Sequence, residues 1–123
     1  MPGERDLSRL LQGLRPRLYP DRYTFAPAVD CALTANQFAL VREDEGLTSI
    51  HADPEGEWAR ISLEVHSSLE AVGLTATLSS RLAELGISAN IVAARNHDHL
   101  FVPWDRREKA LAALRSLENG ETD

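Results

Sequence analysis

The spacing of hydrophobic residues changes along the chain, and each spacing predicts a helix or a strand. Near the N-terminus the leucines recur at helical intervals: Leu7, Leu10, Leu11 and Leu14. Asp6 or Ser8 can cap this short helix, and Pro16 marks its end. A turn at Tyr19-Pro20-Asp21 then leads to strand-like runs at residues 23–29, 37–42 and 47–51.

The second half of the chain has clearer periodicity. Residues 58–66 alternate between polar and apolar side chains, which predicts a strand with one apolar face. Leucines at helical spacing follow, with Gly86 as the stop: Leu74, Leu78, Leu82 and Leu85. Residues 87–94 read as a buried strand, 95–98 as a hairpin turn and 100–102 as the returning strand. Asp105 and Glu108 form a predicted capping box for a last helix that ends at Asn119-Gly120.

From Trp58 the predicted order is strand, helix, strand, strand, helix, which is most of a ferredoxin-like unit in an α+β fold. Its last strand is missing from the sequence that follows, so it must come from residues 23–51 or from a partner chain. We therefore expect residues 1–56 to be an N-terminal helix plus strands that pack on or complete the sheet. Residues 57–118 form the main unit, and residues 119–123 form a disordered tail.

Composition narrows the class of protein. A chain of 123 residues with 43% hydrophobic and 26% charged residues suits one soluble domain. A formal net charge of −6 argues against nucleic acid as a partner. Cys31 is the only cysteine, which excludes an intramolecular disulfide. The polar N-terminus and the lack of a long apolar run predict a cytoplasmic protein with no membrane partner.

The turn between the alternating strand and the next helix is the candidate ligand site. Its residues are Ser67, Ser68, Glu70, Gly73, Leu74 and Thr75. Free backbone N–H groups at the helix start suit a carboxylate, and Glu70 suits an α-amino group. Gly73 lets the backbone approach a ligand closely. In the alternative reading, Ser67 and Glu70 merely form a capping box around a tight turn.

Other polar residues leave alternatives open. His97 and His99 share a face if both lie in a strand, and with His66 they form a possible zinc or nickel site. The alternative is a polar turn, or a pH-sensitive contact. Asn90 interrupts an apolar strand, so its amide either faces the ligand or pairs with a strand end. Cys31 has no histidine nearby in sequence, and no phosphate-binding or dinucleotide motif is present, so we expect no catalytic activity and no cofactor.

Residues 58–118 resemble the ACT-domain superfamily of small-molecule-sensing domains in the order and spacing of their elements. Residues 67–75 look like its turn and first helix, and residues 87–92 look like its second strand. The sequence is more similar still to an uncharacterised bacterial branch of ACT-like proteins, which shares three segments: residues 45–48, residues 65–76 (Val-His-Ser-Ser-Leu-Glu-Ala-Val-Gly-Leu-Thr-Ala) and residues 97–103 (His-Asp-His-Leu-Phe-Val-Pro). The resemblance implies a regulatory homodimer that binds an amino acid or a small carboxylate at residues 67–75, with Asn90 nearby. We expect no catalytic domain for it to regulate, so the resemblance does not imply a particular regulated target. A protein-interaction module without a ligand and a histidine-based metal-binding protein are the alternative functions.

Overall fold

The computed structural model describes residues 3–29 and 32–120, which form three α-helices, one 3₁₀ turn and six β-strands. In chain order they are α1 (Leu7–Gln12), β1 (Pro16–Ala28), β2 (Gln37–Glu43), β3 (Gly46–Ala52), β4 (Trp58–Leu63), α2 (Leu74–Glu84), β5 (Asn90–Ala93), β6 (Asp98–Pro103), η1 (Trp104–Arg106) and α3 (Arg107–Glu118). The predicted tail includes residues 121–123, which lie outside the described residues, as does Cys31.

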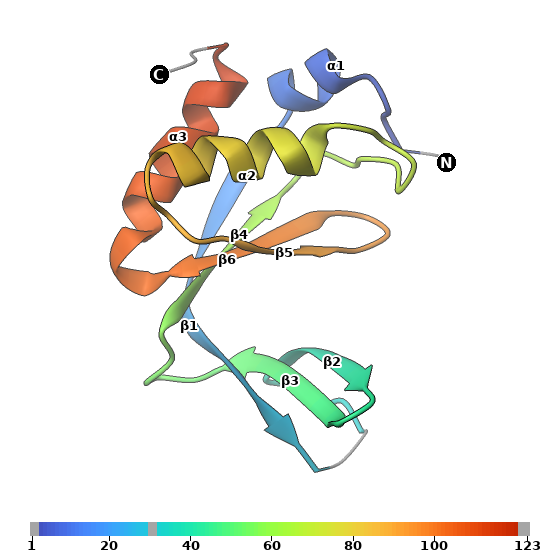
Figure 1. The fold of residues 1–123 in the computed structure, drawn as a ribbon, viewed down its shortest axis with the longest axis vertical. Helices are drawn as coiled ribbons and strands as arrows, with labels where there is room; N and C mark the ends of the chain where they lie inside the picture. The colour runs from blue at the N-terminus through green and yellow to red at the C-terminus, as the bar shows by residue number, and fades with distance from the viewer. Residues whose placement is uncertain (1–2, 30–31, 121–123) are drawn as a thin grey trace.

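All strands join one antiparallel sheet in the order β2-β3-β1-β4-β6-β5. The mixed α and β architecture and the three N-terminal strands are as predicted. The helices lie together on one side of β4, β6 and β5, while the hairpin of β2 and β3 lies at the far end of the long strand β1 (Figure 1). The neighbour of β4 on the side opposite β6 is therefore β1 of the same chain.

Alternation along the central strands sorts side chains between two faces of the sheet. Ile61, Leu63 and Leu100 are fully buried toward the helices, where they pack with the leucines of α2 and α3. On the other face, a smaller cluster forms around Tyr23 and Phe101, because the sheet bends and brings β2 toward β6. The core therefore depends on the period-two pattern read from the sequence.

The turn predicted at Tyr19-Pro20-Asp21 is wrong, because β1 runs straight through these residues. The register with β4 shifts between Leu18 and Arg22, and pairing with β3 begins at Tyr23. Pro20 thus sits where β1 pairs with neither neighbour, and its missing N–H costs no ladder hydrogen bond.

The helix cap predicted for α1 is confirmed, and the one predicted for α3 is not. Asp6 caps α1, since its side chain accepts a hydrogen bond from the Arg9 backbone N–H. The capping box predicted at Asp105 and Glu108 is wrong: within the described residues, α3 has no side-chain cap and follows directly from the turn η1. That 3₁₀ turn supplies the backbone carbonyl of Trp104 to the start of α3.

Truncating the core is expected to cost much more stability than truncating the surface. Leu82 is fully buried against the sheet, whereas Leu33 is 63% exposed. We expect Leu82→Ala to lower the free energy of unfolding by about 2–5 kcal/mol, because it removes apolar burial and leaves a cavity. The matched control Leu33→Ala should change it by less than about 0.5 kcal/mol. Urea unfolding measures both, and equal losses would contradict this assignment of the core.

Candidate functional site

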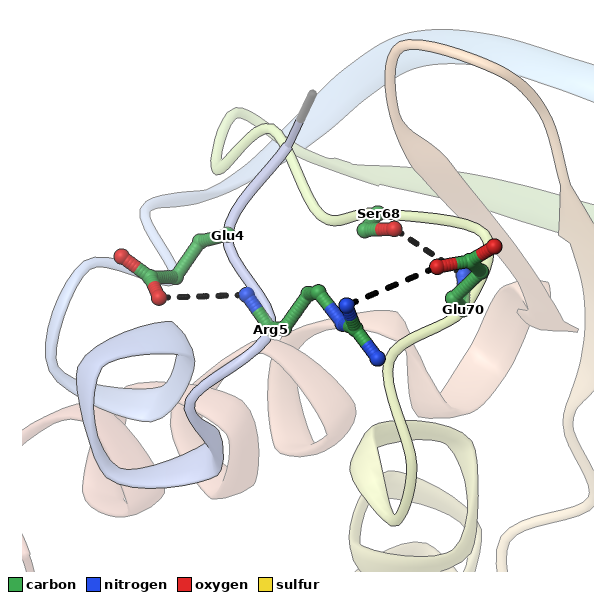
Figure 2. Close-up of polar contacts among 4 residues, drawn as sticks. All are labelled: Glu4, Arg5, Ser68 and Glu70. Carbon is green, nitrogen blue, oxygen red and sulfur yellow. Dashed lines mark hydrogen bonds and ion pairs between the residues drawn. The ribbon is translucent and has the colours of Figure 1, made fainter.

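The segment between β4 and α2 is held against the N-terminal segment, residues 3–6. The Glu4 N–H donates to the His66 carbonyl at 2.9 Å, and the Ser68 N–H donates to the Glu4 carbonyl at 2.9 Å. These bonds form a parallel bridge between Glu4 and Ser67. Figure 2 shows the two segments running side by side.

Glycine at position 3 makes this close approach possible. A Cβ built on Gly3 would lie 2.5 Å from the Ser67 carbonyl carbon. Real Cβ atoms essentially never come this close to backbone, so any larger residue would push residues 3–6 away from the loop. The N-terminal segment, residues 3–6, therefore packs closely against the backbone of the loop that follows β4.

A groove of about 440 Å³ lies beside this segment. Its lining is Gly3, His66, Ser67, Ser68, Leu69, Glu70 and Arg95. The Glu70 carboxylate pairs with the Arg5 guanidinium at 3.6 Å, and both side chains are well exposed (Figure 2). Arg95 is also exposed, and its guanidinium has no hydrogen-bond or ion-pair partner among the described residues. The groove thus presents an anion and an unpaired cation.

The start of α2 faces a different and much smaller space. Gly73 adopts a left-handed conformation, φ +97°, and no described side chain caps the helix. Leu74 and Thr75 line a cavity of about 70 Å³ together with Ser67 and Asp98. This volume suits one or two waters rather than an amino acid.

The capping box considered for Ser67 and Glu70 does not form. The buried Ser67 hydroxyl donates to Asp98 Oδ2 at 3.1 Å instead. The Glu70 N–H donates to the Ser68 hydroxyl at 3.0 Å, which tightens the loop. Of the sequence-predicted residues, Ser67, Ser68 and Glu70 therefore line the larger groove, while Leu74 and Thr75 line only the smaller cavity.

Asp98 is a buried carboxyl group on the helix side of the sheet. Burial raises its pKa above the usual value of 3.8, while the Ser67 hydrogen bond and the nearby His97 act in the opposite direction. Because Asp98 lines the cavity at the start of α2, the protein's own carboxyl group already lies where sequence reasoning placed a ligand carboxylate.

His99 lies on the opposite face of the sheet. Its Nδ1 is 2.7 Å from the Ser62 hydroxyl, which also accepts a hydrogen bond from Arg60 Nε at 3.0 Å. Its ring contacts Phe38 edge to face, with ring centroids 4.9 Å apart. Burial, then the positive charges of Arg60 and His97, lower the pKa of His99 from 6.5 to about 4. His99 is therefore neutral near pH 7.

The histidines do not converge on a metal site. His97 Nδ1 lies 3.5 Å from the Val65 carbonyl, His66 is exposed and His99 contacts Phe38. Within residues 3–29 and 32–120, no group of three His, Cys, Asp or Glu side chains is placed to hold a metal ion. The same part of the chain contains no helix with the length and apolar character needed to cross a bilayer.

Asn90 differs from its predicted setting. It is exposed at the start of β5, which is an edge strand, and lines neither the groove nor the cavity described above. Its amide needs no protein partner because water reaches it.

Sequence reasoning missed three residues of the groove region: Gly3, Arg5 and Arg95. Arg95 belonged to a predicted hairpin turn, and Gly3 and Arg5 preceded the first predicted helix. No local pattern linked these segments, since they meet the loop only through the tertiary fold. The sequence shows that residue 3 is a glycine, but it does not show which part of the backbone packs against it.

Comparisons with known proteins agree on the family. One ACT-domain model matches residues 55–116, and a second ACT-domain model matches residues 2–68. The search of curated proteins found no match.

The solved structures that are similar to this chain include the following two. One is a Vibrio cholerae protein of unknown function, described as a possible transport protein. It is 38% identical with a TM-score of 0.75, and the match covers 91% of this chain and 95% of that chain. The other, an Agrobacterium tumefaciens protein, is 18% identical with a TM-score of 0.65, covering 85% of this chain and 89% of that chain, and shows likeness of fold alone.

The lowered pKa of His99 predicts a pH dependence of stability. Between pH 6.5 and about 4, the unfolded chain binds a proton at this residue that the folded chain does not bind. The free energy of unfolding should therefore fall as pH falls through this window, and His99→Gln should reduce that loss. Urea unfolding at several pH values compares this variant with the exposed-histidine control His66→Gln. Asp98 is present in every variant, so its opposite contribution cancels. Equal pH slopes for His99→Gln and wild type would contradict the assignment.

Proposed function

This chain belongs to the ACT-domain family, and on that premise we propose that it is a non-catalytic sensor that binds an α-amino acid in the groove beside residues 66–70. One observation carries the proposal: Glu70 and the unpaired Arg95 line the same groove and have opposite charges. ACT domains are commonly ligand-binding regulatory modules, which is consistent with a binding role.

The groove matches the chemistry of a zwitterion. The guanidinium of Arg95 recognises the α-carboxylate, and the carboxylate of Glu70 recognises the α-ammonium group. The Ser68 hydroxyl and the His66 imidazole line the same space and add polar contacts. A volume of about 440 Å³ lies within the usual range for small-molecule sites, which is about 300–1,000 Å³.

This location refines the site expected from sequence. The cavity at the start of α2 is about 70 Å³ and already faces the Asp98 carboxyl group, so it holds no amino acid in this conformation. We assign Gly73, Leu74 and Thr75 to shaping the loop rather than to ligand contact. The exposed position of Asn90, away from the groove, argues against a role in the same site.

The N-terminal segment gives a mechanism for signalling. Arg5 occupies the carboxylate of Glu70 in this structure, so a ligand ammonium group competes with Arg5 for the same oxygen atoms. Ligand binding then favours an arrangement in which residues 3–6 are released or shifted, which is a population shift between two states. A partner protein that binds only one of the two arrangements of residues 3–6 would respond to the ligand.

We also infer that β4, α2, β5, β6 and α3 form a ferredoxin-like unit whose fourth strand is supplied by β1. The strand order β1-β4-β6-β5 and the hydrogen bond from the Arg15 N–H to Glu118 Oε2, 2.9 Å, support this. The bond places the end of α3 beside the start of β1, where a chain leaving α3 would enter a fourth strand. A cytoplasmic homodimer is the assembly and location that we propose on the family resemblance.

A thermal-shift screen against the twenty amino acids and matching carboxylates tests the site. We expect one amino acid to raise the melting temperature, because a ligand that prefers the folded state stabilises it. Arg95→Gln should weaken binding of that amino acid and of its analogue without the amino group, each by about tenfold or more. Glu70→Gln should weaken binding of the amino acid but not of the analogue.

The charge-matched controls are Glu64→Gln and Lys109→Gln, whose side chains are exposed and do not line the groove. Both controls should bind like the wild type. If no amino acid or carboxylate shifts the melting temperature, or if Glu70→Gln binds the amino acid normally, the proposed site is wrong.

Removing Arg5 should strengthen ligand binding. In Arg5→Gln the Glu70 carboxylate is free, so the ligand ammonium group no longer has to displace a guanidinium. Exposed ion pairs contribute about 0–1 kcal/mol, so we expect the Kd to fall by up to about fivefold. Isothermal titration calorimetry compares this variant with Arg9→Gln, which removes a nearby exposed charge outside the groove. Unchanged or weaker binding in Arg5→Gln would argue against competition at Glu70.

A further inference from the structure

A second groove lies on the helical layer, away from the site proposed above. It has a volume of about 330 Å³ and lies between α2 and the end of α3. Its lining residues are Ala76, Thr77, Ser80, Arg81, Glu84 and Leu117, and it shares none of them with the first groove. It therefore needs a separate explanation.

Arg81 is the unusual residue of this groove. Its side chain is only 11% exposed, and its Nε is the one buried side-chain nitrogen or oxygen without a hydrogen-bond partner in the described residues. The remaining contacts are long: a terminal nitrogen lies 3.5 Å from the Ser116 hydroxyl, and the other lies 3.5 Å from a Glu84 oxygen. A guanidinium carries five N–H donors, and here the Nε–H donor is buried without an acceptor among the described residues.

If Arg81 served only to hold α2 and α3 together, we would expect its guanidinium to form shorter hydrogen bonds. A guanidinium that ties two helices together gains most from short, paired hydrogen bonds, and a buried donor left without a partner costs about 1–3 kcal/mol. Here the contacts to Ser116 and Glu84 are at the limit of useful distance. The Glu84 side chain is 64% exposed and can turn to solvent, since an exposed ion pair contributes about 0–1 kcal/mol. These two polar contacts therefore contribute little to the present orientation of the guanidinium.

We propose that this groove binds a small oxyanion, that is, a phosphate or carboxylate group. Nε is buried in this structure, so the guanidinium would have to turn toward the groove for Nε and a terminal nitrogen to bind one oxyanion, which is the bidentate geometry that arginine forms with such groups. The hydroxyls of Thr77 and Ser80 line the same space and donate to the remaining oxygen atoms. The net charge of −6 disfavours a polyanion and suits a single small group.

An NMR titration with inorganic phosphate, acetate and chloride at matched ionic strength tests the proposal. We expect phosphate or acetate to cause saturable shifts of the Arg81 Nε–H signal and of the Thr77 and Ser80 amides, whereas chloride does not. Loss of that side-chain signal in Arg81→Gln assigns it. A response to phosphate alone identifies a phosphate site, and a response to acetate identifies a carboxylate site.

Ser80→Glu is the decisive variant, because it places a carboxylate at the groove without removing a buried side chain. It should weaken oxyanion binding by about tenfold or more through repulsion. Ala83→Glu adds the same charge to an exposed position of α2 outside the groove and should bind like the wild type. Shifts that chloride reproduces, or normal binding by Ser80→Glu, would overturn the proposal. Glu70→Gln should leave this response intact, which separates it from the amino-acid site.

Discussion

β1 pairs with β3 along one edge and with β4 along the other, and the rest of the structure depends on this double pairing. It joins the hairpin of β2 and β3 to the strands that carry the helices (Figure 1). A strand with one unpaired edge would expose backbone N–H and C=O groups beside the main core. Because β1 covers that edge of β4, Ile61 and Leu63 are enclosed between the sheet and the helices. The shift in register at Pro20 lets one strand satisfy two neighbours that start at different points.

The same pairing creates the candidate ligand groove. β1 begins directly after α1, so fixing β1 against β4 also fixes α1 and residues 3–6 near the loop that leaves β4. The backbone bonds between Glu4 and the loop, and the close approach of Gly3 to Ser67, follow from that placement. A segment held by two backbone hydrogen bonds and one exposed ion pair is weakly held compared with the core. In the mechanism proposed above, this difference in stability lets the N-terminal segment shift when a ligand binds while the sheet stays intact.

The charged side chains have different surroundings at the first groove, on the opposite face of the sheet and in the helical layer. Glu70, Arg5 and Arg95 are exposed around the first groove, whereas Arg60 and His99 are partly buried among aromatic rings on the opposite face. The Arg60 guanidinium lies 3.9 Å from the Tyr19 ring centroid and 4.4 Å from that of Phe38, so it links β4 to β1 and β2. This cation–π contact supports the bend of the sheet, and its charge contributes to the low pKa of His99. Arg81, by contrast, lies in the helical layer, where its buried Nε has no hydrogen-bond partner among the described residues.

The pattern of residues along the chain was enough to predict the helices of the second half, the three N-terminal strands and the buried faces of β4 and α2. A segment buried on one side repeats its apolar residues at the period of a helix or a strand, so the pattern is visible locally. It also placed Ser67, Ser68 and Glu70 in a loop before a helix, and the family resemblance carried the ACT assignment. The three-dimensional arrangement was needed to show that β1 pairs with β4, that Arg5 meets Glu70 and that Arg95 lines the same groove as Glu70. These contacts join residues far apart in the chain, and no local period encodes them. The misread turn at Pro20 and the exposed Asn90 have the same cause, since whether a polar or proline residue is tolerated in a strand depends on which edge its neighbours leave unpaired.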